Sequence, residues 1–584
     1  MYLLPLALLL LTIFVTGSYY ENADDITITL LLQGVLTAQP TANVHLGMHG
    51  VGHVLAALYR LSPEVPWYGF FLYGALYLAM VLHFALIQRL GRRILTNPQI
   101  AVVLIGLFLM IWAEQGLWFN YTRIATLLGA GAFLGYAFDA KEPGSRHIRA
   151  AVFYTLAFLL ALCIYPMGAV LGAALALPAA VRVPGRTGMD FQNLVTSVVP
   201  LVLISILAFS ATVLSRSDDE VSFNRLMSRY KDYHQNGTYF FRPSGAQPDA
   251  KRSYAVKEAV RDGFLGDRVA INEPYFDRAG RLDWGKFATQ RLPGKLTELA
   301  KRVAIDYYLA LLVNLALVIY CYQRLQSRTR RRLLIFTQVW VVVILVLIGG
   351  LWKLPPRLAG PGMAIITILN LAFLLRHRRF RLPKVPVWGW AILVLLFASH
   401  IYRTGARMLL LAVKQDQHEQ FLLSLERRFH GQLIVGAGLE TYFPALSPWE
   451  TYSFGTNKLL LLTGWQTLAP EFREYLHKIT GHTTLGPAFT ALANRPKTIW
   501  ITTIGFEQRI NHLLAAVHRT HLTLVPFKPH VQGPLYDNLN EYLVAIQPGG
   551  TAPAGAFPGQ LLKPLPTVLP DSARLPGGAP SRAQ

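Results

Sequence analysis

Long apolar segments separated by short polar loops dominate the first two thirds of the chain. A helix needs about 20 predominantly apolar residues to cross the roughly 30 Å hydrocarbon core of a membrane. About eleven segments approach this length, at residues 2–17, 67–87, 99–113, 122–138, 150–165, 167–181, 192–213, 303–323, 333–351, 360–375 and 386–402. The pattern predicts a polytopic α-helical membrane protein. The two segments on either side of Tyr165-Pro166 are short, and a re-entrant hairpin is the alternative there.

The loops between these segments alternate in charge. Lys and Arg concentrate in every second loop, as they do in the cytoplasmic loops of membrane proteins. The basic loops contain Arg89, Arg92 and Arg93; Lys141, Arg146 and Arg149; Arg182 and Arg186; Arg324, Arg328, Arg330, Arg331 and Arg332; and Arg376, Arg378, Arg379, Arg381 and Lys384. We expect a multi-pass protein of the cytoplasmic (inner) membrane, with a cytoplasmic N-terminus, an uncleaved first segment and an outward, periplasmic C-terminus. The alternative for the first segment is a signal peptide, although a basic n-region and an A-x-A-like site before Ser18 are absent.

This orientation divides the chain into three parts. Residues 1–402 form a transmembrane domain that includes two outward loops, 18–66 and 214–302. Residues 403–546 form an outward soluble α/β domain with a parallel or mixed sheet. Its predicted strands lie at 432–435, 459–462 and 498–502, and its predicted helices at 412–429, 470–480 and 505–520. Residues 547–584 are rich in Pro, Gly and Ala, and we expect a disordered tail because few large apolar side chains are available for burial.

Composition narrows the function classes. Of 584 residues, 53% are hydrophobic and 15% charged, whereas soluble proteins carry roughly 25% charged residues. The predicted cytoplasmic loops account for the net charge of +23, so it does not indicate a nucleic-acid partner. Only Cys163 and Cys321 are present, which excludes a disulfide framework and a Cys-rich metal site. The sequence also lacks a P-loop, a nucleophile elbow and a dinucleotide-binding fingerprint.

Three carboxylates follow the first apolar segment at the membrane surface. They belong to Glu21, Asp24 and Asp25. Acidic side chains at this depth are costly unless they are solvated, paired or used in chemistry. One interpretation is helix capping, with Asn22 or Asp24 as the N-cap. The other is catalysis, with Asp24 or Asp25 as a general base. The two are compatible, since a helix start can orient a catalytic carboxylate.

Three histidines repeat every four residues later in the same loop. On a helix, His45, His49 and His53 share one face. Such spacing can bind zinc, but the Glu of the H-E-x-x-H motif is absent, and neighbouring glycines weaken a helix. The alternatives are contact with a substrate and a polar helix face near the headgroups. We predict no tightly bound structural metal here.

Several other charged side chains lie at the predicted outer surface, where cations run against the positive-inside bias. Binding of the phosphate of a lipid-linked substrate is one explanation for these outward cations. Contact with acidic lipid headgroups is the alternative. Glu114 and Arg123 occupy one outward turn and are placed to pair with each other. The candidate substrate-binding residues are Glu21, His45, His49, His53, Arg60, Glu114, Arg123, Lys353, Arg357 and Arg403.

The plan of the chain resembles the integral-membrane glycosyltransferases of the GT-C type. Those proteins have many spans, an acidic residue or pair in a long first outward loop, and often an outward soluble C-terminal domain. Here Asp24-Asp25, the 18–66 loop, the predicted spans and residues 403–584 match that plan. Arg60 to Gly69 and Leu462-Thr463-Gly464-Trp465 also look like bacterial membrane proteins of this general type.

The resemblance implies transfer of a sugar from a polyprenyl-phosphate donor to a glycan, lipid or protein acceptor. Asp24 or Asp25 would accept the proton of the acceptor hydroxyl, and Arg60, Lys353, Arg357 or Arg403 would stabilise the lipid phosphate that leaves. Use of a divalent cation stays open, since relatives of this fold include metal-using and metal-free enzymes. The alternative functions are a transporter or flippase of a lipid-linked or anionic substrate and a non-catalytic assembly or sensor protein.

Overall fold

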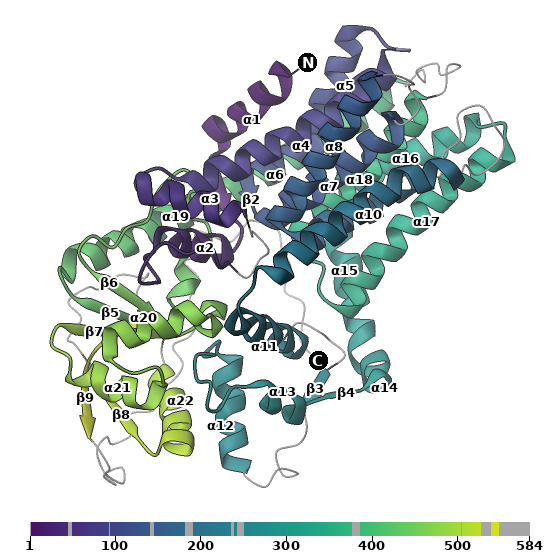
Figure 1. The fold of residues 1–584 in the computed structure, drawn as a ribbon. Helices are drawn as coiled ribbons and strands as arrows, with labels where there is room; N and C mark the ends of the chain where they lie inside the picture. The colour runs from purple at the N-terminus through teal and green to yellow at the C-terminus, as the bar shows by residue number, and fades with distance from the viewer. Residues whose placement is uncertain are drawn as a thin grey trace, which may run out of the picture.

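The structure, a computed structural model, describes residues 2–44, 50–92, 94–139, 145–180, 191–234, 239–241, 250–376, 386–503, 505–526 and 539–547. A bundle of long helices forms the upper part of the molecule, and an α/β domain lies below it (Figure 1). The bundle helices are α1 (Leu3–Thr16), α4 (Trp67–Gly91), α5 (Asn97–Leu107), α7 (Tyr121–Asp139), α8 (Ser145–Ile164), α9 (Pro166–Ala176), α10 (Phe191–Leu214), α16 (Tyr308–Arg324), α17 (Arg328–Leu351), α18 (Pro356–Leu375) and α19 (Val387–Arg428).

Each predicted apolar segment overlaps one of these helices. Among the described residues, five helices are long and apolar enough to cross a membrane, or up to seven if each of two sharply bent pairs is one span. The five are Trp67–Gly91, Asn97–Leu117, Arg328–Leu351, Pro356–Leu375 and Val387–Arg428. The four shorter apolar helices include Leu3–Thr16 and Pro166–Ala179. The total of eleven spans therefore stays a prediction.

The outer surface of the bundle is apolar. Along α17, the exposed side chains include Ile335, Val339, Val342 and Val346. A continuous row of exposed apolar side chains is unfavourable in water and favourable in the hydrocarbon core of a membrane. A helix is stable there because its backbone groups bond one another. The protein is thus a polytopic helical membrane protein.

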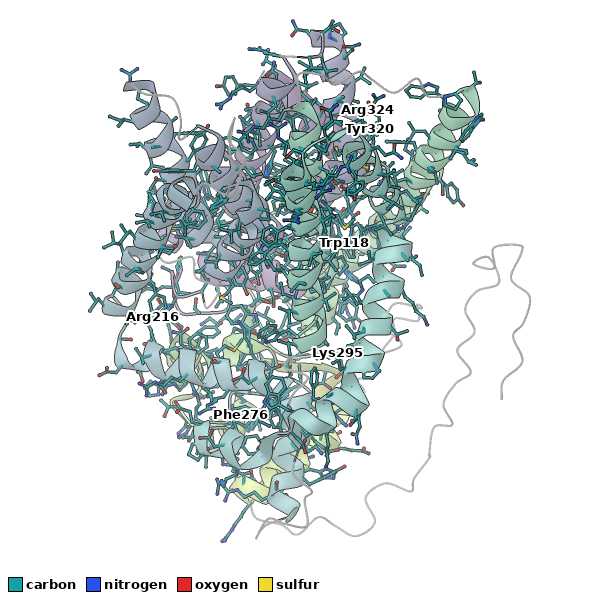
Figure 2. The ribbon with its side chains drawn as sticks, turned by 90° about the vertical axis from the view of Figure 1, so that its right-hand side faces the viewer. Trp118, Arg216, Phe276, Lys295, Tyr320 and Arg324 are labelled. Carbon is teal, nitrogen blue, oxygen red and sulfur yellow. The ribbon has the colours of Figure 1, made fainter. Side chains whose placement is uncertain are left out.

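The described ends of three predicted cytoplasmic loops meet at one end of the bundle. Arg89 donates a hydrogen bond to the Phe138 carbonyl oxygen at 3.1 Å, and the Arg376 guanidinium lies 5.7 Å from the centre of the Phe138 ring. Figure 2 shows Arg324, from another basic loop, toward the upper end of the molecule, with Phe276 of the 214–302 segment far below it. Arg324 and the 214–302 segment therefore lie toward opposite ends of the molecule. The side of the membrane that each end faces stays a prediction.

Residues 433–547 contain the five-stranded sheet of the α/β domain. The strands are β5 (Leu433–Ala437), β6 (Lys458–Leu461), β7 (Thr498–Thr503), β8 (His521–Pro526) and β9 (Leu539–Gln547), in the order β6-β5-β7-β9-β8. The first three strands are parallel, and β9 runs antiparallel to β7 and β8. The helices are α20 (Pro470–Thr480), α21 (Leu485–Asn494) and α22 (Phe506–Leu513). The mixed sheet and its three predicted strands are confirmed, whereas β8 and β9 were not predicted.

The boundary predicted at residue 403 lies inside one continuous helix. α19 has 42 residues, about 63 Å at 1.5 Å per residue. It is therefore about twice as long as the hydrocarbon core is thick. The predicted helix at 412–429 is the extension of α19 from the bundle to β5. Of the predicted tail, only Gln547 is described, as the last residue of β9, and 548–584 lie outside the described residues.

The 214–302 segment packs on the α/β domain. It comprises α11 (Asp218–His234), β3 (Tyr239–Phe241), α12 (Ala250–Arg261), α13 (Glu273–Ala279), β4 (Gly280–Leu282), α14 (Trp284–Lys286) and α15 (Leu292–Asp306). Phe264 stacks on Phe489 with the ring centroids 6.2 Å apart, and His518 bonds Asp267 at 2.7 Å. One apolar core contains side chains from both segments, so they form a single unit, which the sequence did not predict.

Candidate catalytic site

The acidic segment of the first loop begins a short helix between the bundle and the α/β domain. This helix is α2 (Ala23–Gln33), and Asn22 is its N-cap with extended backbone. Just before it, β1 (Tyr19–Tyr20) pairs in parallel with β2 (Trp118–Phe119). That pairing joins the first loop to the 114–121 turn and fixes the direction in which α2 leaves the bundle. The predicted helix start at Asn22 is confirmed, although its side chain makes no capping bond.

Asp25 is fully buried and held by three donors. Its Oδ1 atom accepts hydrogen bonds from the Tyr68 hydroxyl at 2.9 Å and the Tyr121 backbone N–H at 3.4 Å. Its Oδ2 atom accepts one from Asn120 Nδ2 at 2.7 Å. Burial raises the pKa of Asp25 to about 8, while the donors partly oppose that rise. Because every oxygen is engaged, Asp25 anchors α2 to α4 and α7.

Asp24 is half-buried and points to other partners. Its Oδ2 atom accepts a hydrogen bond from Asn22 Nδ2 at 2.8 Å, and its Oδ1 atom accepts one from Trp465 Nε1 at 3.1 Å. Trp465 begins the short 3-10 helix η6 (Trp465–Leu468), which follows β6 in the α/β domain. Asp24 therefore lies where the first loop meets the C-terminal domain.

The loop geometry that places Trp465 needs a glycine before it. Gly464 has φ +94°, a region that side chains other than glycine rarely adopt, and its N–H bonds the Gly263 carbonyl oxygen at 2.8 Å. A Cβ atom at Gly464 would lie 2.4 Å from Gln466 Oε1. The 214–302 segment and the α/β domain thus fix the position of Trp465 together.

Two cations belong to the electrostatic surroundings of Asp24. Its carboxylate acts on the Lys231 ammonium of α11, whose pKa is lowered by burial and partly restored by Asp24. The charges of Asp24 and Arg357 both act on the phenol groups of Tyr121 and Tyr165, so both charges lie on the same side of the site as these two tyrosines. Among the described residues, neither Lys231 nor Arg357 has a hydrogen-bond or ion-pair partner.

Four of the predicted substrate-binding residues belong to a separate network of ion pairs. They are Glu21, Glu114, Arg123 and Arg403. Arg123 Nε lies 2.8 Å from Glu21 Oε2, and Arg123 Nη1 lies 3.9 Å from Glu114 Oε1. Glu114 in turn pairs with Arg407 at 3.1 Å. Arg403 pairs with Asp306 at 2.5 Å, and Arg407 lies 3.8 Å from the same Asp306 oxygen. Three carboxylates and three guanidinium groups alternate here, so this network neutralises itself and ties the first loop to α7 and α19.

Arg60, His53 and Lys353 lie away from Asp24 in different surroundings. Arg60 and His53 line a cavity of about 470 Å³ beside α3 (Val51–Leu61), and Arg60 donates to the Pro40 carbonyl oxygen at 3.0 Å. Lys353 is exposed, and its charge acts on Lys295. His45 and His49 lie outside the described residues, so the three-histidine face is not tested. No group of three or more metal-ligating side chains occurs in the part of the chain that the structure describes.

Sequence reasoning missed Lys231, Asn120, Tyr68 and Trp465 as neighbours of the acidic pair. Tyr68 was interpreted as a membrane-interface anchor. The only signal for Trp465 was the Leu462-Thr463-Gly464-Trp465 stretch, in which a glycine follows a strand. Lys231 carried no signal, because a lysine within a polar helix is ordinarily solvated.

Comparison with known proteins finds a likeness to a solved structure. No family model matches the chain, and no curated protein matches it. The fold is similar to the crystal structure of ArnT from Cupriavidus metallidurans bound to undecaprenyl phosphate, with 12% sequence identity and a TM-score of 0.46 over 92% of this chain and 97% of that one.

Proposed function

We propose that this protein is a membrane glycosyltransferase that moves a sugar from a polyprenyl-phosphate donor to an acceptor at the outer face of the cytoplasmic membrane. The observation that carries the proposal is the half-buried Asp24 carboxylate with Lys231 and Arg357 in its electrostatic surroundings, two cations that have no hydrogen-bond or ion-pair partner among the described residues. A base beside a cationic site is the arrangement that displacement at a phosphate-bound sugar carbon needs.

Asp24 is the better candidate for the base than Asp25. Both oxygens of Asp25 accept bonds within the fold, and the side chain is fully buried. Asp24 is partly accessible, and its two bonds, to Asn22 and Trp465, leave lone pairs for an acceptor hydroxyl. Asp25 then has a supporting role, because it fixes the first turn of α2, from which Asp24 projects.

In the proposed step, the acceptor oxygen attacks the anomeric carbon while its proton passes to the Asp24 carboxylate, and the bond between that carbon and the phosphate oxygen breaks. The polyprenyl phosphate leaves with the electron pair, and the charge that develops on it is stabilised by Arg357 and Lys231. In this scheme the positive charge near the leaving phosphate comes from the Arg357 and Lys231 side chains. A divalent cation would add further positive charge without replacing either residue.

The assay for this proposal follows release of polyprenyl phosphate from polyprenyl-phosphate sugars in vesicles that contain the purified full-length protein. The wild type should release it when an envelope extract supplies acceptors. Lys231→Ala and Arg357→Ala should raise the KM for the donor about tenfold or more, because each removes a charge-assisted contact. Lys301→Ala, an exposed lysine on α15, is the matched control. Equal donor KM values in all four proteins would contradict the assignment of the cations.

A further inference from the structure

A cavity lies at the far end of α2 from Asp24. It has a volume of about 470 Å³ and lies between residues 37–43, α3 and α20. Figure 1 shows α2 and α3 between the helix bundle and the α/β domain, beside α20. We propose that this cavity binds a saccharide segment of the acceptor, an inference that rests on the proposed function and deepens it.

The wall of the cavity is built by close backbone packing. A Cβ atom at Gly34 would lie 2.6 Å from the Pro40 nitrogen, and Gly34 has φ +80°. A Cβ atom at Gly52 would lie 2.7 Å from the Ala42 carbonyl oxygen. The Thr41 N–H bonds the Leu31 carbonyl oxygen at 3.1 Å. The 37–43 segment therefore folds back on α2 and packs on α3 in a defined way.

The lining is suited to hydroxyl groups. Its polar members are Thr37, Gln39, Thr41, Asn43, His53, Arg60, Glu471 and Glu474, and its remaining members are alanines and one proline. Hydroxyl, amide, guanidinium and carboxylate groups offer the mixed donors and acceptors that sugar hydroxyls need. The lining contains no aromatic or large aliphatic side chain, so an acyl or polyprenyl chain would gain little by entering.

One carboxylate in the wall is held by the 37–43 segment. Glu471 Oε1 accepts hydrogen bonds from Asn43 Nδ2 at 2.6 Å and from Thr41 Oγ1 at 3.4 Å, and Glu471 Oε2 is buried and accepts none from the described residues. Burial raises the pKa of Glu471, and the charges of Glu220 and Glu474 add to that rise. These carboxylates disfavour phosphate or another anion despite Arg60, so the cavity is distinct from the donor phosphate site.

The position suits an acceptor longer than one sugar. From Asp24 to Leu31, where the cavity wall is anchored, α2 rises about 10 Å. On the other side, η6 and α20 follow one another, so Trp465 at Asp24 and Glu471 at the cavity are six residues apart. A saccharide held at Glu471 therefore has to reach about 10 Å along α2 for its end to meet the Asp24 carboxylate.

The test is a binding titration of the purified full-length protein in detergent, with the trimer of β-linked glucosamine and its N-acetylated counterpart as probes. We expect saturable binding, tighter for the amino form because of the two carboxylates in the lining, Glu471 and Glu474. Glu471→Gln keeps the size of the side chain and should weaken binding of the amino trimer about tenfold. Glu474→Gln should weaken it in the same direction. Asp218→Asn, an exposed carboxylate on α11 that is not in the lining, is the control.

The outcomes separate this inference from the proposed function. Asp24→Asn should bind the trimer like the wild type, because binding at this cavity needs no base. No saturable binding of either trimer would overturn the inference, and so would equal binding by the wild type, Glu471→Gln and Glu474→Gln. Failure of the proposed function would instead appear as undiminished sugar transfer by Asp24→Asn, whatever the trimers do.

Discussion

The indole N–H of Trp465 donates a hydrogen bond to Asp24 Oδ1 at 3.1 Å, across 441 residues of sequence. The donor belongs to the C-terminal α/β domain, and the acceptor belongs to the first outward loop. A carboxylate held in this way keeps one orientation, which a general base requires. The α/β domain is thus part of the proposed active site.

Trp465→Phe should lower kcat for sugar transfer about tenfold while the KM for the donor changes little. Phe keeps the aromatic packing but cannot donate to Asp24, so the base loses its orientation. The measurement is steady-state release of polyprenyl phosphate. Trp284→Phe, on an exposed tryptophan of α14, is the matched control. If Trp465→Phe has the wild-type kcat, the bond has no role in turnover.

Asp25 should make stability fall as pH rises. Its pKa is raised by burial from 3.8 to about 8. Between these values the folded protein keeps a proton that the unfolded chain has lost, so the free energy of unfolding decreases with rising pH. Asp25→Asn lacks this contribution. Its apparent Tm should therefore depend less on pH, from about pH 5 to about pH 8, than that of the wild type or Asp218→Asn. Parallel pH profiles for all three would show that Asp25 does not titrate in this range.

Arg123→Gln should destabilise the fold by about 3–5 kcal/mol, because it leaves the buried Glu21 carboxylate beside a neutral side chain, whereas Glu114 keeps Arg407. Arg229→Gln breaks an exposed pair with Asp277, 3.2 Å apart, and should cost less than about 1 kcal/mol. Thermal unfolding of both variants in one detergent compares them directly. Similar Tm values for the two variants would mean that the buried network contributes no more than a surface pair.

The two ends of the bundle should face opposite sides of the membrane. In a background without Cys163 and Cys321, a cysteine at Asp218 should react with an impermeant thiol reagent in intact cells. A cysteine at Arg330, in a predicted cytoplasmic loop, should react only after lysis. Both positions are exposed, so accessibility within the fold is matched. The reverse pattern would invert the predicted orientation.

The local sequence pattern was sufficient to predict those elements that are determined by neighbouring residues in the sequence. Short apolar runs predicted β5, β6 and β7 to within about two residues, and polar residues before an apolar run predicted the start of α2, with Asn22 or Asp24 as its N-cap. The hairpin of β8 and β9 was missed, because its short alternating runs border proline- and glycine-rich sequence. The local pattern did not show that α19 continues past residue 402. The side chains become polar there, which suggested the end of a span, although the helical spacing of the apolar residues continues.

The candidate site was only partly predictable, because its neighbours depend on long-range packing. Arg403 was proposed as a phosphate ligand, but Asp306, 97 residues earlier, occupies its guanidinium. Arg60 was grouped with Arg357, yet the fold back at Gly34 places Arg60 beside the cavity at Glu471. Lys231 became relevant only once α11 packed near α2. The sequence showed which charged residues lie in the outward loops, but it did not show which of them pair with one another.

The most direct measurement compares sugar transfer by Asp24→Asn, Asp25→Asn and Asp218→Asn in the same vesicles, at protein levels matched by folded fraction. Asn keeps the size of the side chain and its capping ability but cannot accept the proton. We predict that Asp24→Asn lowers kcat about 100-fold or more, that Asp218→Asn has the wild-type rate, and that Asp25→Asn keeps measurable turnover. Wild-type kcat for Asp24→Asn would contradict the assignment of Asp24 as the base.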